Sequence, residues 1–249
     1  MLAEPTLTSR REDGRDVPLL VWRADRPLLS VSSAPLGGGI GVRHWVVNAT
    51  VPMSYHRDDP ADHLAELAGQ LGLDGPGVGL LTGVDVAEVV ARADAGVRVW
   101  ATVGLGTPVQ AAAPDPAAAP DPAADPVQAA DPDPVPAAAP GPARRGVPAH
   151  RVGTVNIVVE VPVRLGDAAL VNAVATATEA KAQAIRELGL AATGTPTDAV
   201  TVLCPAGGEP SAYGGPRSAW GAPLARAVHA AVLAGGAGTV VPWSERRTA

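Results

Sequence analysis

The pattern of apolar and polar positions in the second half of the chain predicts a long helix, a hydroxyl-rich loop and a buried strand. Asp167 is a plausible N-cap, and Gly189 stands where a left-handed residue would end the helix. Residues 199–203 have the β-branched content of a buried strand. One stripe of the helix, about 100° wide, is expected to face the core. Its members, spaced alternately three and four residues apart, are Val171, Val174, Thr178, Lys181, Ile185 and Leu188.

The rest of the chain alternates short apolar runs with further helical stretches. The Asp-Arg-Pro sequence at residues 25–27 indicates a hairpin between the first two strands. Because strands in adjacent pairs are interrupted by helices, the predicted fold class is α+β, a single layered domain with a mixed β-sheet and flanking helices. We expect strands at residues 19–23, 28–33, 44–49, 78–82, 97–103, 154–161 and 199–203, and additional helices at about 60–71, 85–94 and 223–233.

A proline-rich segment interrupts this pattern. Residues 108–148 hold twelve of the 26 prolines, mostly in Asp-Pro or Ala-Pro units, with no large apolar side chain beyond isolated valines. Such a composition cannot form a packed core. We therefore predict a disordered or polyproline-like insertion in one domain made of residues 1–107 and 149–249. A boundary between two domains is the alternative.

Composition narrows the classes of partner. A net charge of −6 over 249 residues argues against binding to nucleic acid. The apolar runs are far shorter than the roughly 20 residues that span a bilayer, and the charged N-terminus is not followed by an apolar block, so we expect a cytoplasmic protein with no membrane contact. The single cysteine, Cys204, is expected to be a buried, inert thiol. The five histidines are scattered, and no metal site is predicted.

Lys181 is the first candidate for chemistry, because it is the only lysine of the chain and falls on the apolar stripe. Its stem could pack while the ammonium reaches water, or the ammonium could belong to a site. The glycine run at residues 37–41 is more typical of a tight turn than of a phosphate cradle. Small polar residues gather at the ends of the expected strands: Thr82, Asp85, Thr102, Thr107, Thr154, Asn156, Thr193, Thr195, Thr197 and Asp198.

Several short motifs occur in an order that resembles the adenosylcobinamide amidohydrolase family. The more specific ones are T-E-A-K-A at residues 178–182 and G-T-P-T-D-A at residues 194–199. The resemblance covers about residues 30–107 and 153–233. It departs from the family at residues 102–107, which read T-V-G-L-G-T where the family usually has a serine and an asparagine. The other motifs are S-S-A-P-L-G-G-G-I-G at 32–41, N-x-x-V-P-x-x-Y at 48–55, L-L-T-G-V-D-V at 80–86, G-T-V-N-I at 153–157 and Y-G-G-P-R-S-A-W-G at 213–221.

The resemblance implies an amide hydrolase of corrinoid salvage. Its reaction would cleave the amide between aminopropanol and the propionate arm of adenosylcobinamide and release adenosylcobyric acid for cobamide (vitamin B12) synthesis. The cobalt would arrive inside the corrinoid substrate, so no separate cofactor is expected. A non-catalytic corrinoid-binding protein and an amidase for another amide are the alternatives, and the oligomeric state stays open.

Amide hydrolysis needs an attacking oxygen, a proton carrier and donors for the oxyanion. The candidates are Thr195 or Thr197 as nucleophile or donor, Asp198 as base or orienting carboxylate, Lys181 as a stabilising charge and Asn156 as an amide donor. The candidate substrate-binding residues are Gly38, Gly39, Asn48, Thr82, Thr102, Glu179, Tyr213 and Gly214.

Overall fold

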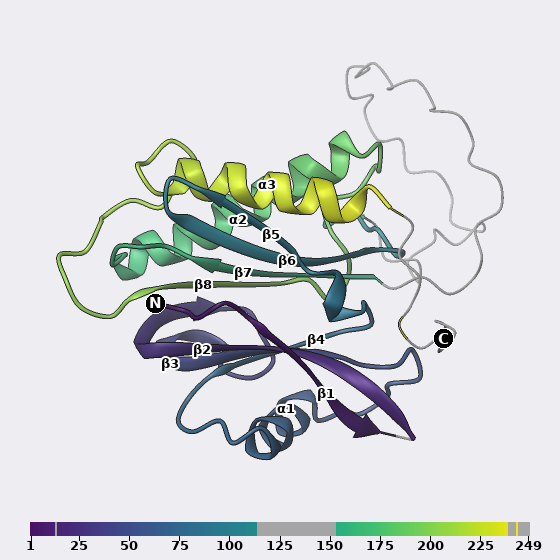
Figure 1. Cartoon of the computed structure of the whole chain (residues 1–249). Helices are drawn as coiled ribbons and strands as arrows, with labels where there is room; N and C mark the ends of the chain where they lie inside the picture. Colours follow the sequence, from purple (N-terminus) through teal and green to yellow (C-terminus); the bar gives the residue numbers. More distant parts are fainter. Residues whose placement is uncertain (13, 114–152, 239–242, 244–249) are drawn as a thin grey trace, which may run out of the picture. The chain divides into compact units, whose positions relative to one another are not determined.

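The computed structural model describes residues 1–12, 14–113, 153–238 and 243. Within them the strands form one mixed sheet in the order β4-β3-β2-β8-β7-β6-β5, with β1 paired to β2 (Figure 1). The pairs β3–β4 and β7–β8 are parallel. The predicted α+β class with a mixed sheet is therefore confirmed. The elements are β1 (Thr6–Glu12), β2 (Arg15–Ser32), β3 (Gly39–Thr50), α1 (Pro60–Gln70), β4 (Val78–Thr82), η1 (Val86–Glu88), β5 (Val90–Asp94), β6 (Val97–Leu105), β7 (Gly153–Glu160), α2 (Asp167–Glu187), β8 (Ala199–Pro205) and α3 (Gly221–Gly236).

The predicted insertion at residues 108–148 lies largely outside the described residues, which stop at residue 113 and resume at residue 153. Residues 1–111 and 150–249 group into one unit, which contains all the strands and helices named above. The two strands that flank the insertion, β6 and β7, are antiparallel neighbours in the sheet.

Three apolar clusters hold the layers of this unit together. One packs β6, β7 and β8 against α2 and α3, and another packs β2 and β3 against α1 (Figure 1). The third lies between two halves of the sheet, one formed by β1 to β4 and the other by β5 to β8. There Trp22 of β2 meets Trp100 of β6 edge to face with ring centroids 6.0 Å apart. Successive side chains of β7 point to opposite faces of the sheet, which explains this arrangement. Ile157 faces the helices, and Val158 faces the other half of the sheet.

The predicted hairpin at residues 25–27 is wrong, because β2 continues through it as one long strand. Both parts of β2 pair with β3 in the same direction, with a shift of register between Arg23 and Leu28. The turn-like residues therefore form an irregularity within the strand. Beyond it, residues from Leu28 to Ser32 also pair with β8, so the second part of β2 joins the two halves of the sheet.

The predicted helix at residues 85–94 is also wrong. Asp85 caps a single 3₁₀ turn by accepting a hydrogen bond from the Ala87 N–H at 3.0 Å, and the chain then enters β5. β5 turns into β6 through Ala95 and Gly96, whose φ angles are 46° and 85°. Two consecutive residues of positive φ form the turn that matches the twist of a two-stranded hairpin.

The buried face of α2 differs from the predicted stripe. Lys181 and Ile185 are buried as predicted, but Val171 is 58% exposed and Thr178 is exposed. Small side chains fill most of the buried face instead, since α2 packs against both the sheet and α3. The helix ends as predicted, with Gly189 at φ 79°. The residues of α2 that are buried are Ala169, Leu170, Ala173, Thr176, Ala177, Ala180, Lys181, Ala184 and Ile185.

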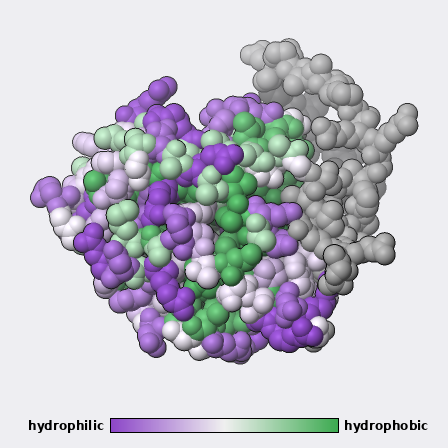
Figure 2. Space-filling model, viewed as in Figure 1, coloured by the Kyte–Doolittle hydropathy of each residue, from purple (hydrophilic) through white to green (hydrophobic). Residues whose placement is uncertain are grey.

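No helix within the described ranges is both long and apolar enough to cross a membrane. On the face drawn in Figure 2, hydrophobic residues form a band between hydrophilic areas.

A larger side chain on the buried face of α2 should destabilise the fold. We expect Ala177→Leu to lower the free energy of unfolding by about 1–3 kcal/mol, because Ala177 is 0% exposed and has no space for three further carbon atoms. Val171→Leu, on the exposed side of the same helix, should change it by less than about 0.5 kcal/mol. Urea denaturation of both variants measures the difference. Equal stability of the two variants would contradict the close packing of this helix.

Candidate active site

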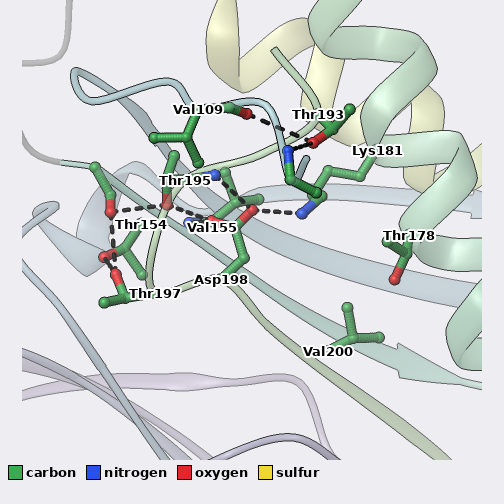
Figure 3. A network of polar contacts seen from close by, with 12 residues as sticks. Val109, Thr154, Val155, Thr178, Lys181, Thr193, Thr195, Thr197, Asp198 and Val200 are labelled. Carbon is green, nitrogen blue, oxygen red and sulfur yellow. Dashed lines mark hydrogen bonds and ion pairs between the residues drawn. The ribbon is translucent and has the colours of Figure 1, made fainter. Parts of the chain in front are cut away.

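The candidate active site lies where the parallel strands β7 and β8 begin, next to the C-terminal half of α2. Parallel strands start at the same edge of a sheet, and Asn156 of β7 pairs with Ala199 of β8. Residues 193–198 lead into β8 at this edge, and the Lys181 side chain reaches them from α2 (Figure 3). Thr178, one turn earlier on α2, lies apart from the network.

An ion pair between Lys181 and Asp198 forms the centre of the site, with side chains only 7% and 9% exposed. Oδ2 of Asp198 accepts hydrogen bonds from Lys181 Nζ and, at 3.0 Å, from the backbone N–H of Thr195. Oδ1 accepts hydrogen bonds from the backbone N–H of Val155 at 2.8 Å and from the Thr195 hydroxyl at 2.5 Å. Four donors fill the acceptor sites of an ionised carboxylate. Asp198 is therefore fixed by residues of α2, β7 and its own loop.

The structure decides between the two positions considered for the Lys181 ammonium. The ammonium lies in the interior against Asp198, and does not reach water along the helix surface. Gly194 makes this close contact possible, because a Cβ there would lie 2.6 Å from Lys181 Nζ and nearer still to Asp198 Oδ2. Any larger residue at position 194 would therefore separate the pair.

Threonine hydroxyls extend the network from this centre towards the surface. Thr195 is buried, and its hydroxyl lies 2.8 Å from the carbonyl oxygen of Gly153 as well as next to Asp198. Thr197 is exposed, and its hydroxyl lies 3.0 Å from the same carbonyl and 2.6 Å from the Thr154 hydroxyl. Thr154 is as buried as Thr195, so Thr197 carries the exposed hydroxyl of these three.

Asn156 belongs to a second polar network, between the two halves of the sheet. Its Nδ2 donates to Asn48 Oδ1 at 3.0 Å and to the carbonyl oxygen of Leu81 at 2.9 Å. Nδ2 of Asn48 in turn donates to the Thr102 hydroxyl at 3.0 Å. The side chains of Asn156, Asn48 and Thr102 are all buried. Both hydrogens of the Asn156 amide are therefore already engaged.

Three of the candidate binding residues shape turns near these networks. The Thr82 hydroxyl accepts a hydrogen bond from the Val84 N–H at 3.1 Å, just after β4. Gly38 and Gly39 form the turn between β2 and β3. A Cβ on Gly38 would lie 2.8 Å from the Ala34 carbonyl oxygen, and Gly39 has φ 77°. The two glycines are thus required by backbone geometry.

Glu179, Tyr213 and Gly214 lie away from the ion pair. Glu179 is on the exposed side of α2, and Tyr213 is 76% exposed. Gly214 packs against Ala169 near the start of α2, and its carbonyl oxygen accepts a hydrogen bond from the Thr176 hydroxyl at 2.9 Å. Thr176 precedes Lys181 by five residues, about 7.5 Å along the helix at 1.5 Å per residue. Open hollows of about 250, 690 and 750 Å³ follow this exposed side; Glu179 lines the first two, and Tyr213 and Gly214 line the third.

The sequence analysis missed the segment that covers the loop of residues 193–198. The Val109 N–H donates to the Gly194 carbonyl at 2.8 Å, and the Thr193 N–H donates to the Val109 carbonyl at 2.9 Å (Figure 3). The Ala111 N–H donates to the Thr193 hydroxyl at 3.0 Å. This pairing joins residues more than 80 positions apart in sequence, and no local signal could have indicated it.

Cys204 adds no reactive thiol to the site. Cys204 is fully buried, and burial raises the pKa of its thiol, as expected for an inert cysteine. In the described part of the chain, no three His, Cys, Asp or Glu side chains lie together as a set of metal ligands.

These features define an α+β protein with a preorganised ammonium, carboxylate and hydroxyl centre at one edge of its sheet. The chain belongs to the adenosylcobinamide amidohydrolase family, whose model matches residues 4–239.

Two relatives carry the name adenosylcobinamide amidohydrolase. The protein from Methanosarcina mazei is 26% identical over 170 residues, which are 68% of this chain and 66% of that protein. The protein from Halobacterium salinarum is 46% identical over 83 residues, which are 33% of this chain and 35% of that protein. The matched parts span 66% and 35% of the length of these relatives, slightly under two thirds and about one third.

Replacing one member of the buried ion pair should strongly lower the free energy of unfolding. Replacing both should lower it by less than the sum of the two single effects. We expect Lys181→Met to lower the free energy of unfolding by about 3–5 kcal/mol, because it leaves Asp198 charged and buried without its cation. A double-mutant cycle with Asp198→Asn should give a coupling free energy of at least about 1 kcal/mol. Urea denaturation of the four proteins measures it.

The exposed pair of Arg226 and Asp94 provides the control. Its side chains are 61% and 29% exposed, so the cycle of Arg226→Met and Asp94→Asn should give a coupling of less than about 1 kcal/mol. Equal coupling in the two cycles would contradict a special role of burial at Lys181.

Proposed function

We propose that this protein hydrolyses the amide between aminopropanol and the propionate arm of adenosylcobinamide. Water adds across the C–N bond, and the products are adenosylcobyric acid and free aminopropanol. The family match over residues 4–239 supports the substrate class. The observation that carries the proposal is the buried Lys181–Asp198 pair, which anchors the loop that carries the exposed Thr197 hydroxyl.

Each residue of the network has a proposed part in this reaction. Asp198 positions the loop, because its four acceptor sites are filled and none is free to take a proton from the substrate. Lys181 supplies the positive charge that favours negative charge developing on the amide oxygen. The hydroxyls of Thr197 and Thr154 contact the substrate carbonyl. The attacking oxygen is a water molecule beside Thr197, or it is the Thr197 hydroxyl itself, in which case Thr154 alone contacts the carbonyl oxygen.

The two possible attacking oxygens leave different traces. Attack by Thr197 on the amide carbon breaks the C–N bond, passes the hydroxyl proton to the leaving aminopropanol nitrogen and forms an ester between the enzyme and adenosylcobyric acid, which water then hydrolyses. Intact-protein mass spectrometry detects this ester after rapid quenching. Attack by water forms no such adduct. The position of Thr197 at the surface end of the network makes either course accessible.

Turnover of adenosylcobinamide tests the proposal directly. We expect the parent protein to release adenosylcobyric acid, and Lys181→Met to lose at least about a hundredfold in kcat, the effect of deleting one preorganised electrostatic group. Thr197→Val should cause a comparable loss. Mass spectrometry of the products measures turnover, at a temperature where circular dichroism shows each variant to be folded.

Thr193→Val is the matched control, because the Thr193 hydroxyl bonds only to the covering segment at Val109 and Ala111. Its turnover should stay within a few-fold of the parent. A folded Lys181→Met protein with parental turnover would remove Lys181 from the mechanism. A parent protein that binds adenosylcobinamide without cleaving it would instead be a corrinoid-binding protein, and cleavage of other amides alone would make it a different amidase.

We further propose that the reaction needs no metal other than the cobalt within the substrate. The donors described above are ammonium, hydroxyl and amide groups. EDTA should therefore leave kcat and KM unchanged in the turnover assay. Loss of activity with EDTA that a divalent ion restores would overturn this part of the proposal.

A further inference from the structure

The direction of the hydrogen bonds in the second network is fixed by a backbone carbonyl. The Leu81 carbonyl oxygen can only accept, so the side-chain atom 2.9 Å from it must be the NH₂ group of Asn156. The second hydrogen of that NH₂ then goes to Asn48 Oδ1 at 3.0 Å. Asn48 consequently presents its own NH₂ to the Thr102 hydroxyl. One carbonyl thus sets the orientation of three side chains.

This orientation leaves the carbonyl oxygen of the Asn156 side chain available. Among the described residues, Oδ1 of Asn156 has no hydrogen-bond partner, although the side chain is only 2% exposed. Asn156 and Thr154 lie on the same face of β7, two positions apart and therefore about 7 Å from each other. Thr154 bonds to Thr197, so this hydroxyl pair lies next to the available acceptor along the same face of β7.

The spacing of these two groups suits a secondary amide. A trans amide points its C=O and its N–H in opposite directions. The donor that meets the C=O and the acceptor that meets the N–H therefore stand about 8 Å apart, two hydrogen-bond lengths plus the amide itself. The hydroxyl pair of Thr154 and Thr197 on one side and Asn156 Oδ1 on the other offer this donor and this acceptor.

We propose that Asn156 Oδ1 accepts the N–H of the scissile amide and thereby makes the site selective for secondary amides. Asn156 is then an acceptor for the substrate, and not the donor expected from the sequence. Asn48 and the Leu81 carbonyl hold its amide in the accepting orientation. This inference rests on the proposed function, and it specifies which bond type the site recognises.

The test compares adenosylcobinamide with the ester in which an oxygen replaces the amide nitrogen. With the parent protein, the ester should have a KM at least about tenfold higher than the amide, since it lacks the N–H that Oδ1 accepts. In Asn156→Ala the ratio of kcat/KM for amide over ester should fall at least about tenfold from its parental value. Equal binding of amide and ester by the parent protein would overturn the inference without any variant being needed.

Thr102→Val is the matched control for loss of a network member. It removes the hydroxyl at the end of the hydrogen-bonded series Asn156–Asn48–Thr102 and leaves Asn156 bonded to Asn48 and Leu81. Activity on both substrates should fall by the same factor, so the ratio should equal that of the parent. A ratio that changes as much in Thr102→Val as in Asn156→Ala would assign Asn156 a purely structural role and overturn the inference.

Absence of hydrolysis can be distinguished from absence of N–H recognition. If the parent protein cleaves neither compound, the same comparison is made with equilibrium dissociation constants for the two intact compounds. Tighter binding of the amide, lost in Asn156→Ala, would support recognition of the N–H while refuting hydrolysis. Equal binding of the amide and the ester, or no binding of either, would overturn the inference and the proposed function together.

Discussion

The buried carboxylate of Asp198 is the constraint on which the arrangement of the site depends. A carboxylate that is only 9% exposed is stable inside a protein when hydrogen-bond donors surround it. Those donors come from α2 through Lys181, from β7 through Val155 and from the loop through Thr195. The hydrogen bonds to this one side chain therefore fix the positions of a helix, a strand and the loop that carries Thr197 relative to one another. A catalytic use of this charge requires no further movement of these elements.

The space between the two halves of the sheet has an apolar and a polar end. Trp22 and Trp100 pack in the apolar part, whereas Asn48, Thr102 and Asn156 hydrogen-bond to one another in the polar part. A buried amide group is costly unless it is paired, and the Leu81 carbonyl completes the pairing. This polar part meets the threonine network along one face of β7. The sheet fold thus brings two independent networks to the same edge.

The exposed side of α2 differs in character from the side that carries Lys181. Its hollows run from Tyr213 and Gly214 past Glu179 to Thr193, at the start of the loop that carries Asp198. Glu179 and Tyr213 lie on this exposed side and Lys181 on the buried side, so residues that the family resemblance brought into one candidate site are distributed over two sides of one helix. Shared motifs indicate residues that matter to a family, but only packing shows which of them can act on the same bond.

The sequence by itself determined the elements whose signals are local. The strand at residues 78–82, the start of β8 and the stop of α2 at Gly189 follow from a short apolar run, a β-branched run and a glycine of positive φ, in that order. The position of Lys181 on the core-facing side of α2 also followed from the helical spacing, whereas the burial of its ammonium did not.

Only the tertiary structure decided features that depend on distant partners. Residues 25–27 carry a turn signal, yet pairing with β3 and β8 keeps β2 in one piece. The alanine face of α2 has little hydrophobic periodicity of its own, and it becomes the buried face because the sheet and α3 approach it closely. The partners of Asn156 come from β3 and β4, and those of Asp198 come from α2 and β7. Local propensity reports only on neighbours within a few positions, whereas hydrogen-bond satisfaction in the interior is settled by the whole fold.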